Sequence, residues 1–204
     1  MSSPLPSGHP QRVLRLAVGL VLYGAAEALM VQAALGVSPW TVFAQGLSRL
    51  TGAGLGWVTN AVGLLVLLLW IPLRQRPGAG TVANVLVVGT VIQAVVAVLD
   101  PPSSLPARAA LFTAGLLLLA VASGLYIGAH YGPGPRDGLM TGLHARTGRP
   151  VWQVRTGVEV SVLAVGWALG GDVGPGTLAF AALVGPLVGW TLPVLDVRRA
   201  PATA

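Results

Sequence analysis

The sequence predicts an all-α integral membrane protein with six transmembrane helices, arranged as two inverted three-helix repeats. Of the 204 residues, 54% are hydrophobic and only 9% are charged, whereas about a quarter of the residues of a soluble domain are charged. Six apolar segments are long enough to cross a bilayer, and the two halves of the chain match each other at a constant offset. A β-barrel is not expected, because its strands alternate in polarity over about ten residues.

The six predicted spans follow from length, since a hydrocarbon core of about 30 Å requires roughly 17 to 25 apolar residues. They cover residues 13–35, 55–73, 81–99, 109–131, 151–169 and 177–195. These spans divide the chain into a first repeat at 12–100, a linker at 101–108, a second repeat at 109–197 and a short cytoplasmic tail at 198–204. Residues 1–11, rich in Ser and Pro, are predicted to be a disordered cytoplasmic tail.

Residues 12–33, which include most of the first span, could alternatively be interpreted as a cleaved signal peptide. Glu27 lies inside the region that would have to be apolar, and the repeat described below begins within the same segment. Both observations favour a retained transmembrane helix.

The orientation follows from the arginines, which supply all twelve basic residues. A cytoplasmic N-terminus places ten of them on the inner side of the membrane and only Arg49 and Arg108 on the outer side. This asymmetry is the positive-inside pattern, so both termini are expected in the cytoplasm of a bacterial cell, with the protein in the inner membrane. The net charge of +6 is therefore assigned to orientation, and the expected partner is the lipid bilayer rather than nucleic acid.

A tandem repeat appears when residues 19–100 are laid over 115–196, an unbroken offset of 96 positions. The identities include positions that hydrophobicity does not explain, such as Gly36 with Gly132 and Thr81 with Thr177. Each half has three spans, an odd number, so the second half must enter the membrane in the opposite orientation. This inverted-topology repeat is typical of transporters, although duplication can also serve only to enlarge a helical bundle.

Each half has a short helical segment after its first span, led by glycine and proline. In the first half, Ser38 suits the N-cap and Pro39 the first helical position of a helix through Leu50, which is too short to cross a bilayer. The second half has a Gly/Pro cluster at 132–138, followed by a helix at 139–146. Such segments at matching positions of inverted halves indicate a binding site, or helices that lie flat in the membrane interface.

A helix N-terminus offers unpaired N–H groups and a partial positive charge to an anionic or zwitterionic ligand. The predicted substrate-binding residues therefore surround the starts of the two short helices: Ser38, Pro39, Trp40, Thr41, Gly134, Pro135, Arg136, Asp137 and Gly138.

Two carboxylates lie within predicted spans, where charged residues normally face a cavity or the bundle interior. Glu27 has no basic residue one helical turn away, so it is a candidate for proton or ion coupling or a protonated, hydrogen-bonded core residue. Glu159 follows Arg155 by four positions and shares its helix face, so the pair either couples ions or only lowers the cost of burial. Polar residues such as Asn60, Asn84, Gln93 and Ser123 are expected to join helices.

The string Gly-Pro-Arg-Asp-Gly-Leu-Met at 134–140, the string Gly-Val-Ser-Pro-Trp at 36–40 and the six-span layout resemble the bacterial YczE/YitT-type integral membrane proteins. The resemblance covers roughly residues 12–197 and implies a fold and a membrane location. That family is largely uncharacterised, so the resemblance implies no substrate and no functional residues.

The predicted function is a secondary transporter or permease for a small anionic or zwitterionic solute. The alternative is a non-transporting scaffold or regulator that presents the arginine-rich inner face to a partner protein. No nucleotide-binding or hydrolase motif appears, so no enzymatic activity, cofactor or metal is expected. A monomer and a homodimer both stay open.

Overall fold

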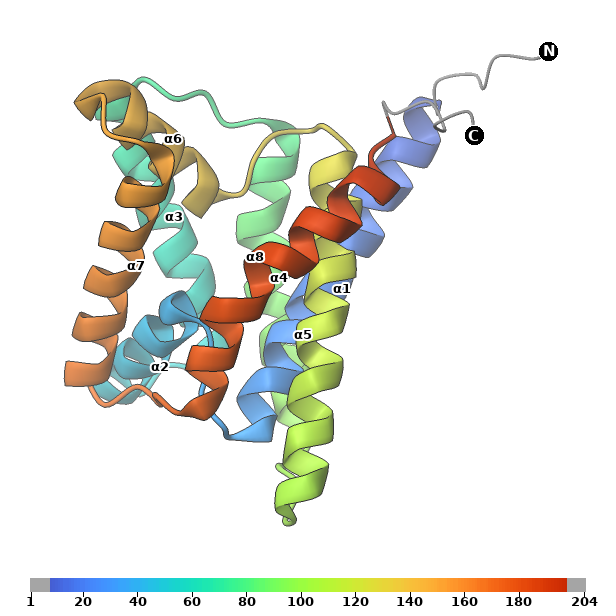
Figure 1. Ribbon diagram of the computed structural model, residues 1–204, viewed down its shortest axis with the longest axis vertical. Coiled ribbons are helices and arrows are strands. Elements are labelled where there is room, and N and C mark those ends of the chain that lie inside the picture. The colour runs from blue at the N-terminus through green and yellow to red at the C-terminus, as the bar shows by residue number, and fades with distance from the viewer. Residues whose placement is uncertain (1–7, 198–204) are drawn as a thin grey trace.

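The computed structural model describes residues 8–197, which form eight helices and no strand within that range (Figure 1). The helices are α1 (His9–Ala33), α2 (Pro39–Thr51), α3 (Leu55–Leu73), α4 (Ala79–Val98), α5 (Leu105–Gly128), α6 (Pro135–Thr147), α7 (Val151–Ala168) and α8 (Pro175–Leu195). Five of them, α1, α3, α4, α5 and α8, are long and apolar enough to cross a membrane. The prediction of an all-α membrane protein is confirmed.

Helix α7 corresponds to the predicted fifth span but is not among those five. It has 18 residues and includes both Arg155 and Glu159. These two charges lower its mean hydropathy, so length alone supports α7 as a span.

Several element boundaries differ from the sequence-based prediction. Helix α1 begins at His9, so the last residues of the predicted tail at 1–11 are helical, with Pro10 in the first turn. Residues 1–7 and the predicted tail at 198–204 lie outside the described residues. Helix α5 begins at Leu105, inside the predicted linker, because Ser104 accepts a hydrogen bond from the Ala107 amide. Helix α6 begins at Pro135 rather than at residue 139, because proline fits the first helical turn.

The short helices α2 and α6 have matching ends. Each contains 13 residues, begins on a proline and stops at a glycine with positive φ, at Gly52 (72°) and Gly148 (67°). The loops before them contain Gly36 and Gly132, with φ of 99° and 118°. Residues with a Cβ rarely adopt positive φ. This explains why glycine occurs in both loops, at Gly36 and Gly132, and at both helix ends, at Gly52 and Gly148.

The two halves of the chain exchange backbone hydrogen bonds. The Gly80 amide at the start of α4 donates to the Tyr131 carbonyl at 2.9 Å, and the Gly176 amide at the start of α8 donates to the Leu35 carbonyl at 2.7 Å. Likewise, α2 packs against α7 and α6 packs against α3. Each half therefore completes the helix ends and the packing of the other.

Helices α1 and α5 pack closely on each other at the centre of the molecule. A Cβ atom at Gly19 would lie 2.8 Å from the Tyr126 amide nitrogen, and one at Gly115 would lie 2.9 Å from the Ala26 carbonyl oxygen. Only glycine permits this approach. Helix α4 packs on α1 and α8 packs on α5, which leaves α2, α3, α6 and α7 on the other side (Figure 1).

The two halves of the chain differ in the packing of their last two helices. Helices α3 and α4 pack together closely, whereas α7 and α8, which occupy the matching positions of the second half, are not closely packed against each other in the described structure. Figure 1 shows α8 crossing the molecule obliquely, apart from α7.

Candidate functional site

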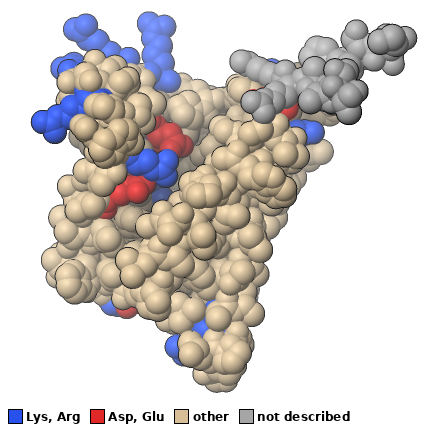
Figure 2. Space-filling model, viewed as in Figure 1, with Lys and Arg blue, Asp and Glu red and all other residues tan. Residues whose placement is uncertain are grey.

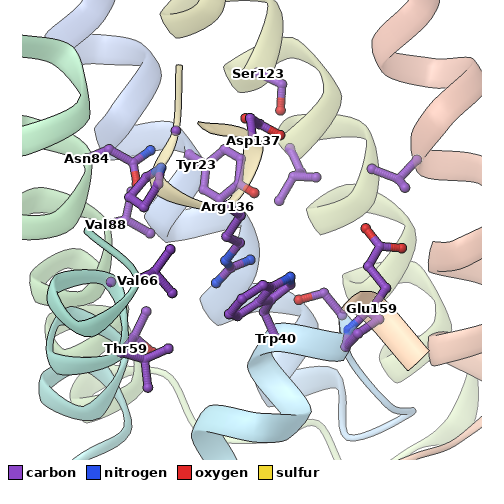
Figure 3. A pocket seen from close by; sticks show the side chains of 18 of the residues that line it. Tyr23, Trp40, Thr59, Val66, Asn84, Val88, Ser123, Arg136, Asp137 and Glu159 are labelled. Carbon is purple, nitrogen blue, oxygen red and sulfur yellow. The ribbon is translucent and has the colours of Figure 1, made fainter. Parts of the chain in front are cut away.

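A cavity of about 230 Å³ lies where the starts of α2 and α6 meet the long helices (Figure 3). It contains most of the predicted site residues. Those that line it are Ser38, Pro39, Trp40, Gly134, Pro135, Arg136, Asp137, Arg155 and Glu159. The remaining three, Glu27, Thr41 and Gly138, do not belong to its lining. The structure therefore brings together residues from both short helices and from α7.

Glu27 lies behind the N-terminus of α2, fully buried at 1% exposure. The Thr41 hydroxyl donates to Glu27 Oε2 at 2.8 Å, and the Ser38 hydroxyl lies 3.5 Å from both carboxylate oxygens. Ser38 also accepts the Thr41 amide at 3.3 Å as the N-cap. The carboxylate thus sits at the positive end of the helix dipole, and Ser38 connects it to the cavity.

Trp40 and Arg136 form a polar contact between the two short helices. The Arg136 guanidinium carbon lies 5.2 Å from the centre of the Trp40 ring, within cation–π range. Trp40 is 6% exposed, and its indole Nε1 has no acceptor among the described residues. A buried N–H group without a partner is costly, so this donor and the adjacent guanidinium offer a place for an anionic group.

Asp137 lies in the first turn of α6 and accepts a hydrogen bond from the Tyr126 hydroxyl at 3.4 Å. Burial raises the pKa of the Asp137 carboxyl, while the charges of Arg155 and Arg136 act in the opposite direction. Figure 3 shows Asp137 and Arg136 together with Tyr23 among the side chains that line the cavity. The first turn of α6 therefore presents one positive and one negative side chain to the same space.

The position of α6 depends on Trp70 of α3. The Trp70 Nε1 donates to the Pro135 carbonyl oxygen at 3.0 Å. A Cβ atom at Gly138 would lie 2.0 Å from Trp70 Cζ2. Gly138, predicted as a binding residue, thus provides room for the indole ring and does not face the cavity.

Arg155 and Glu159 form an ion pair on α7, with Arg155 Nε 3.0 Å from Glu159 Oε1. Their side chains are 49% and 29% exposed. In the same view as Figure 1, Figure 2 shows acidic and basic side chains together in a hollow on this face of the molecule. The pair therefore borders the cavity and is open on its outer side.

Sequence reasoning missed several polar residues of the cavity. Tyr23 and Tyr126 line it, with ring centres 5.8 Å apart in an edge-to-face arrangement. Asn84 and Ser123 also line it, although they were expected to join helices. Asn60 does join helices as expected, since its amide donates to the Thr90 hydroxyl at 3.1 Å. A tyrosine in the middle of an apolar span was the available signal for Tyr23 and Tyr126.

Residues 10–193 match a family described as a family of unknown function, DUF6198. The chain belongs to this family. It is 37% identical over 180 residues to an uncharacterized protein of Haemophilus influenzae, covering 88% of this chain and 83% of that protein. It is 31% identical over 177 residues to the uncharacterized membrane protein YczE of Bacillus subtilis, covering 86% of this chain and 82% of that protein. These matches confirm the resemblance to YczE-type membrane proteins. No solved structure matches the chain significantly.

Proposed function

We propose that this membrane protein is a secondary transporter or permease of the bacterial inner membrane for a small anionic or zwitterionic solute. The observation that carries the proposal is the cavity at which the N-terminal ends of α2 and α6, one from each half, meet. Sites at the junction of two repeat halves, formed by the ends of short helices, are the usual arrangement in secondary transporters.

The proposal includes six spans, with α7 as the fifth, arranged as two inverted repeats. The reciprocal hydrogen bonds of Gly80 and Gly176 support this arrangement, as does the exchanged packing of α2 and α6. Two halves related by a pseudo-two-fold axis would make each such contact twice, with the roles of the halves reversed.

The charges of the cavity support a solute that carries its own charge. The Arg136 guanidinium and the free Trp40 N–H would bind an anionic group, and the Asp137 carboxylate would bind a cationic one. Glu27, linked to the cavity through Ser38, is the proposed proton or ion coupling residue. These residues bind and orient a solute, and the proposal includes no catalytic step.

The distribution of arginines supports a cytoplasmic location for both termini. Figure 2 shows most of the visible basic side chains at the end of the molecule that bears α6 and the start of α1, and few at the opposite end. Arg74, Arg76, Arg146 and Arg149 are exposed. The same exposed arginines favour the second candidate function, a scaffold that binds a partner protein at this face.

Cysteine labelling tests the proposal, because the chain contains no cysteine. Ser38→Cys and Gly134→Cys would place one thiol on each side of the cavity, with Thr41→Cys as a control outside its lining. A membrane-impermeant maleimide is applied to vesicles of each orientation. A transporter should allow the two cavity thiols to react from both faces, at rates that Glu27→Gln changes. Reaction from a single face, unchanged by Glu27→Gln, would refute transport and leave the scaffold.

A further inference from the structure

The packing of α3 against α4 depends on three specific contacts. A Cβ atom at Gly56 would lie 2.1 Å from the Gly89 carbonyl oxygen, so the two backbones meet at these glycines. The Gly56 amide donates to Gln93 Oε1 at 3.1 Å, and the Asn60 amide donates to the Thr90 hydroxyl at 3.1 Å. Small residues and interhelical hydrogen bonds are what holds helices together in a membrane.

The corresponding positions of α7 and α8, 96 residues later, cannot make these contacts. Trp152 takes the place of Gly56, Pro186 that of Thr90, and Gly189 that of Gln93. The tryptophan prevents close backbone approach, and neither proline nor glycine has a side-chain group that can accept the hydrogen bond. The separation of α7 and α8 is therefore built into the sequence.

The gap between α7 and α8 leads to the cavity. Gly185 lines the cavity from α8, with Val184 and Val188 on either side, while Arg155 and Glu159 line it from α7. Apart from the adjoining residues and the backbone of α8 itself, no described atom lies within 4 Å of the place where a Cβ atom of Gly185 would sit. The hollow with acidic and basic side chains in Figure 2 lies on this face. The cavity is thus open sideways, toward the position of the lipid, through a passage whose α8 side is apolar.

The size and charge of the cavity limit what could enter through this gap. At about 230 Å³ the cavity is below the range of about 300 to 1,000 Å³ that is usual for drug-sized ligands. It has room for a polar head group, with Arg136 and the Trp40 N–H for an anion and Asp137 and Glu159 for a cation. A hydrocarbon tail attached to that head group would extend between α7 and α8. It is unfavourable for an ion pair to face only hydrocarbon. The exposed Arg155–Glu159 pair is therefore a further reason to expect a polar group of the ligand beside it.

We infer that the ligand of this cavity is a zwitterionic amphiphile, which enters from the bilayer between α7 and α8 with its tail left in the gap. This inference rests on the proposed function and specifies the substrate class of the same site. On the matching side of the molecule, the packed α3 and α4 leave no comparable gap.

Binding measurements on the purified full-length protein in a nonionic detergent test the inference. Lysophosphatidylethanolamine is the amphiphilic probe, and glycerophosphoethanolamine is the same zwitterionic head group without the acyl tail. Gly185→Trp places a large side chain in the gap, and Gly189→Trp is the matched control, because Gly189 also has open space around it but does not line the cavity. Isothermal titration calorimetry gives the affinities, and size-exclusion chromatography shows whether each variant is folded.

The wild type should bind lysophosphatidylethanolamine more tightly than glycerophosphoethanolamine. Gly185→Trp should weaken binding of the amphiphile by about tenfold or more, since exclusion of only two methylene groups has that effect, and Gly189→Trp should not. Should Gly185→Trp fail to fold, Gly185→Cys replaces it, and the amphiphile should slow its labelling by N-ethylmaleimide.

Two other results would overturn the inference in distinguishable ways. Equal binding of both probes, unaffected by Gly185→Trp, would refute lateral access and leave the proposed function intact. No binding of either probe, with a disulfide-linked dimer forming through Gly185→Cys, would show that a second copy covers the gap, and would count against the proposed function as well.

Discussion

The glycines at matching positions of α4 and α8 should respond in opposite ways to the same substitution. At Gly89, a Cβ atom would lie 2.1 Å from Asn60 Oδ1 and 2.3 Å from the Gly56 carbonyl oxygen. At Gly185, no described atom beyond the adjoining residues and the backbone of α8 lies within 4 Å of the same position. Gly89→Ala therefore forces α3 and α4 apart, whereas Gly185→Ala adds a methyl group to open space.

The expected magnitudes follow from these distances. Overpacking costs about 1–3 kcal/mol, and loss of an interhelical hydrogen bond such as that of Asn60 adds about 0.6 kcal/mol in a membrane protein. Alanine favours the helix over glycine by about 1 kcal/mol, which offsets part of this cost. Gly89→Ala should thus destabilise the protein by about 1–3 kcal/mol, and Gly185→Ala should stabilise it by up to about 1 kcal/mol.

Unfolding by sodium dodecyl sulfate in mixed micelles, followed by circular dichroism, measures both changes in the free energy of unfolding. Wild type and Gly189→Ala, which also has open surroundings, serve as references. The reasoning would be refuted by equal destabilisation from Gly89→Ala and Gly185→Ala, because α7 and α8 would then be packed as closely as α3 and α4.

Three further substitutions test the candidate site. Thr41→Val removes the 2.8 Å hydrogen bond to buried Glu27 and should lower the free energy of unfolding by about 1–3 kcal/mol; Thr113→Val, at an exposed position, is the control and should have almost no effect. Asp137 binds a cationic group only when ionised, and burial raises its pKa. Binding of glycerophosphoethanolamine, whose phosphodiester and amine keep their charges in the acidic range, should therefore fall as the pH is lowered, with a midpoint above the usual aspartate pKa of about 3.9, and Asp137→Asn should weaken this pH dependence. Trp70→Phe keeps most of the indole packing but loses the 3.0 Å hydrogen bond to the start of α6. It should cost about 0.5–1.5 kcal/mol in thermal unfolding, and an unchanged melting temperature would show that this bond does not hold α6.

Much of the local structure could be predicted because it depends on neighbouring residues. Ser38 and Pro39 specify the start of α2 whatever surrounds them, and the prediction of that helix is confirmed. The start of α6 was placed four residues late, because a Gly/Pro cluster suggests a loop although Pro135 fits a first turn equally well. Local patterns thus predict which segments are helical better than they predict where a helix begins.

The arrangement of the site was harder to predict, because it depends on contacts between distant helices. The spacing of Arg136 and Asp137 does not reveal that Arg136 lies over Trp40, since that contact needs both halves in place. The gap between α7 and α8 did have a signal in the sequence. The exchange of Gly56 for Trp152 within the repeat indicates that one side of the molecule cannot pack like the other.

The reciprocal hydrogen bonds of Gly80 and Gly176 have a consequence for biosynthesis. The amide of Gly80 finds its acceptor at Tyr131, which the ribosome adds only after the whole first half has been made. The beginning of α4 therefore stays incomplete while the second half is inserted. An isolated first-half polypeptide would lack this acceptor altogether, so the start of α4 depends on the second half for its structure as well as for its packing.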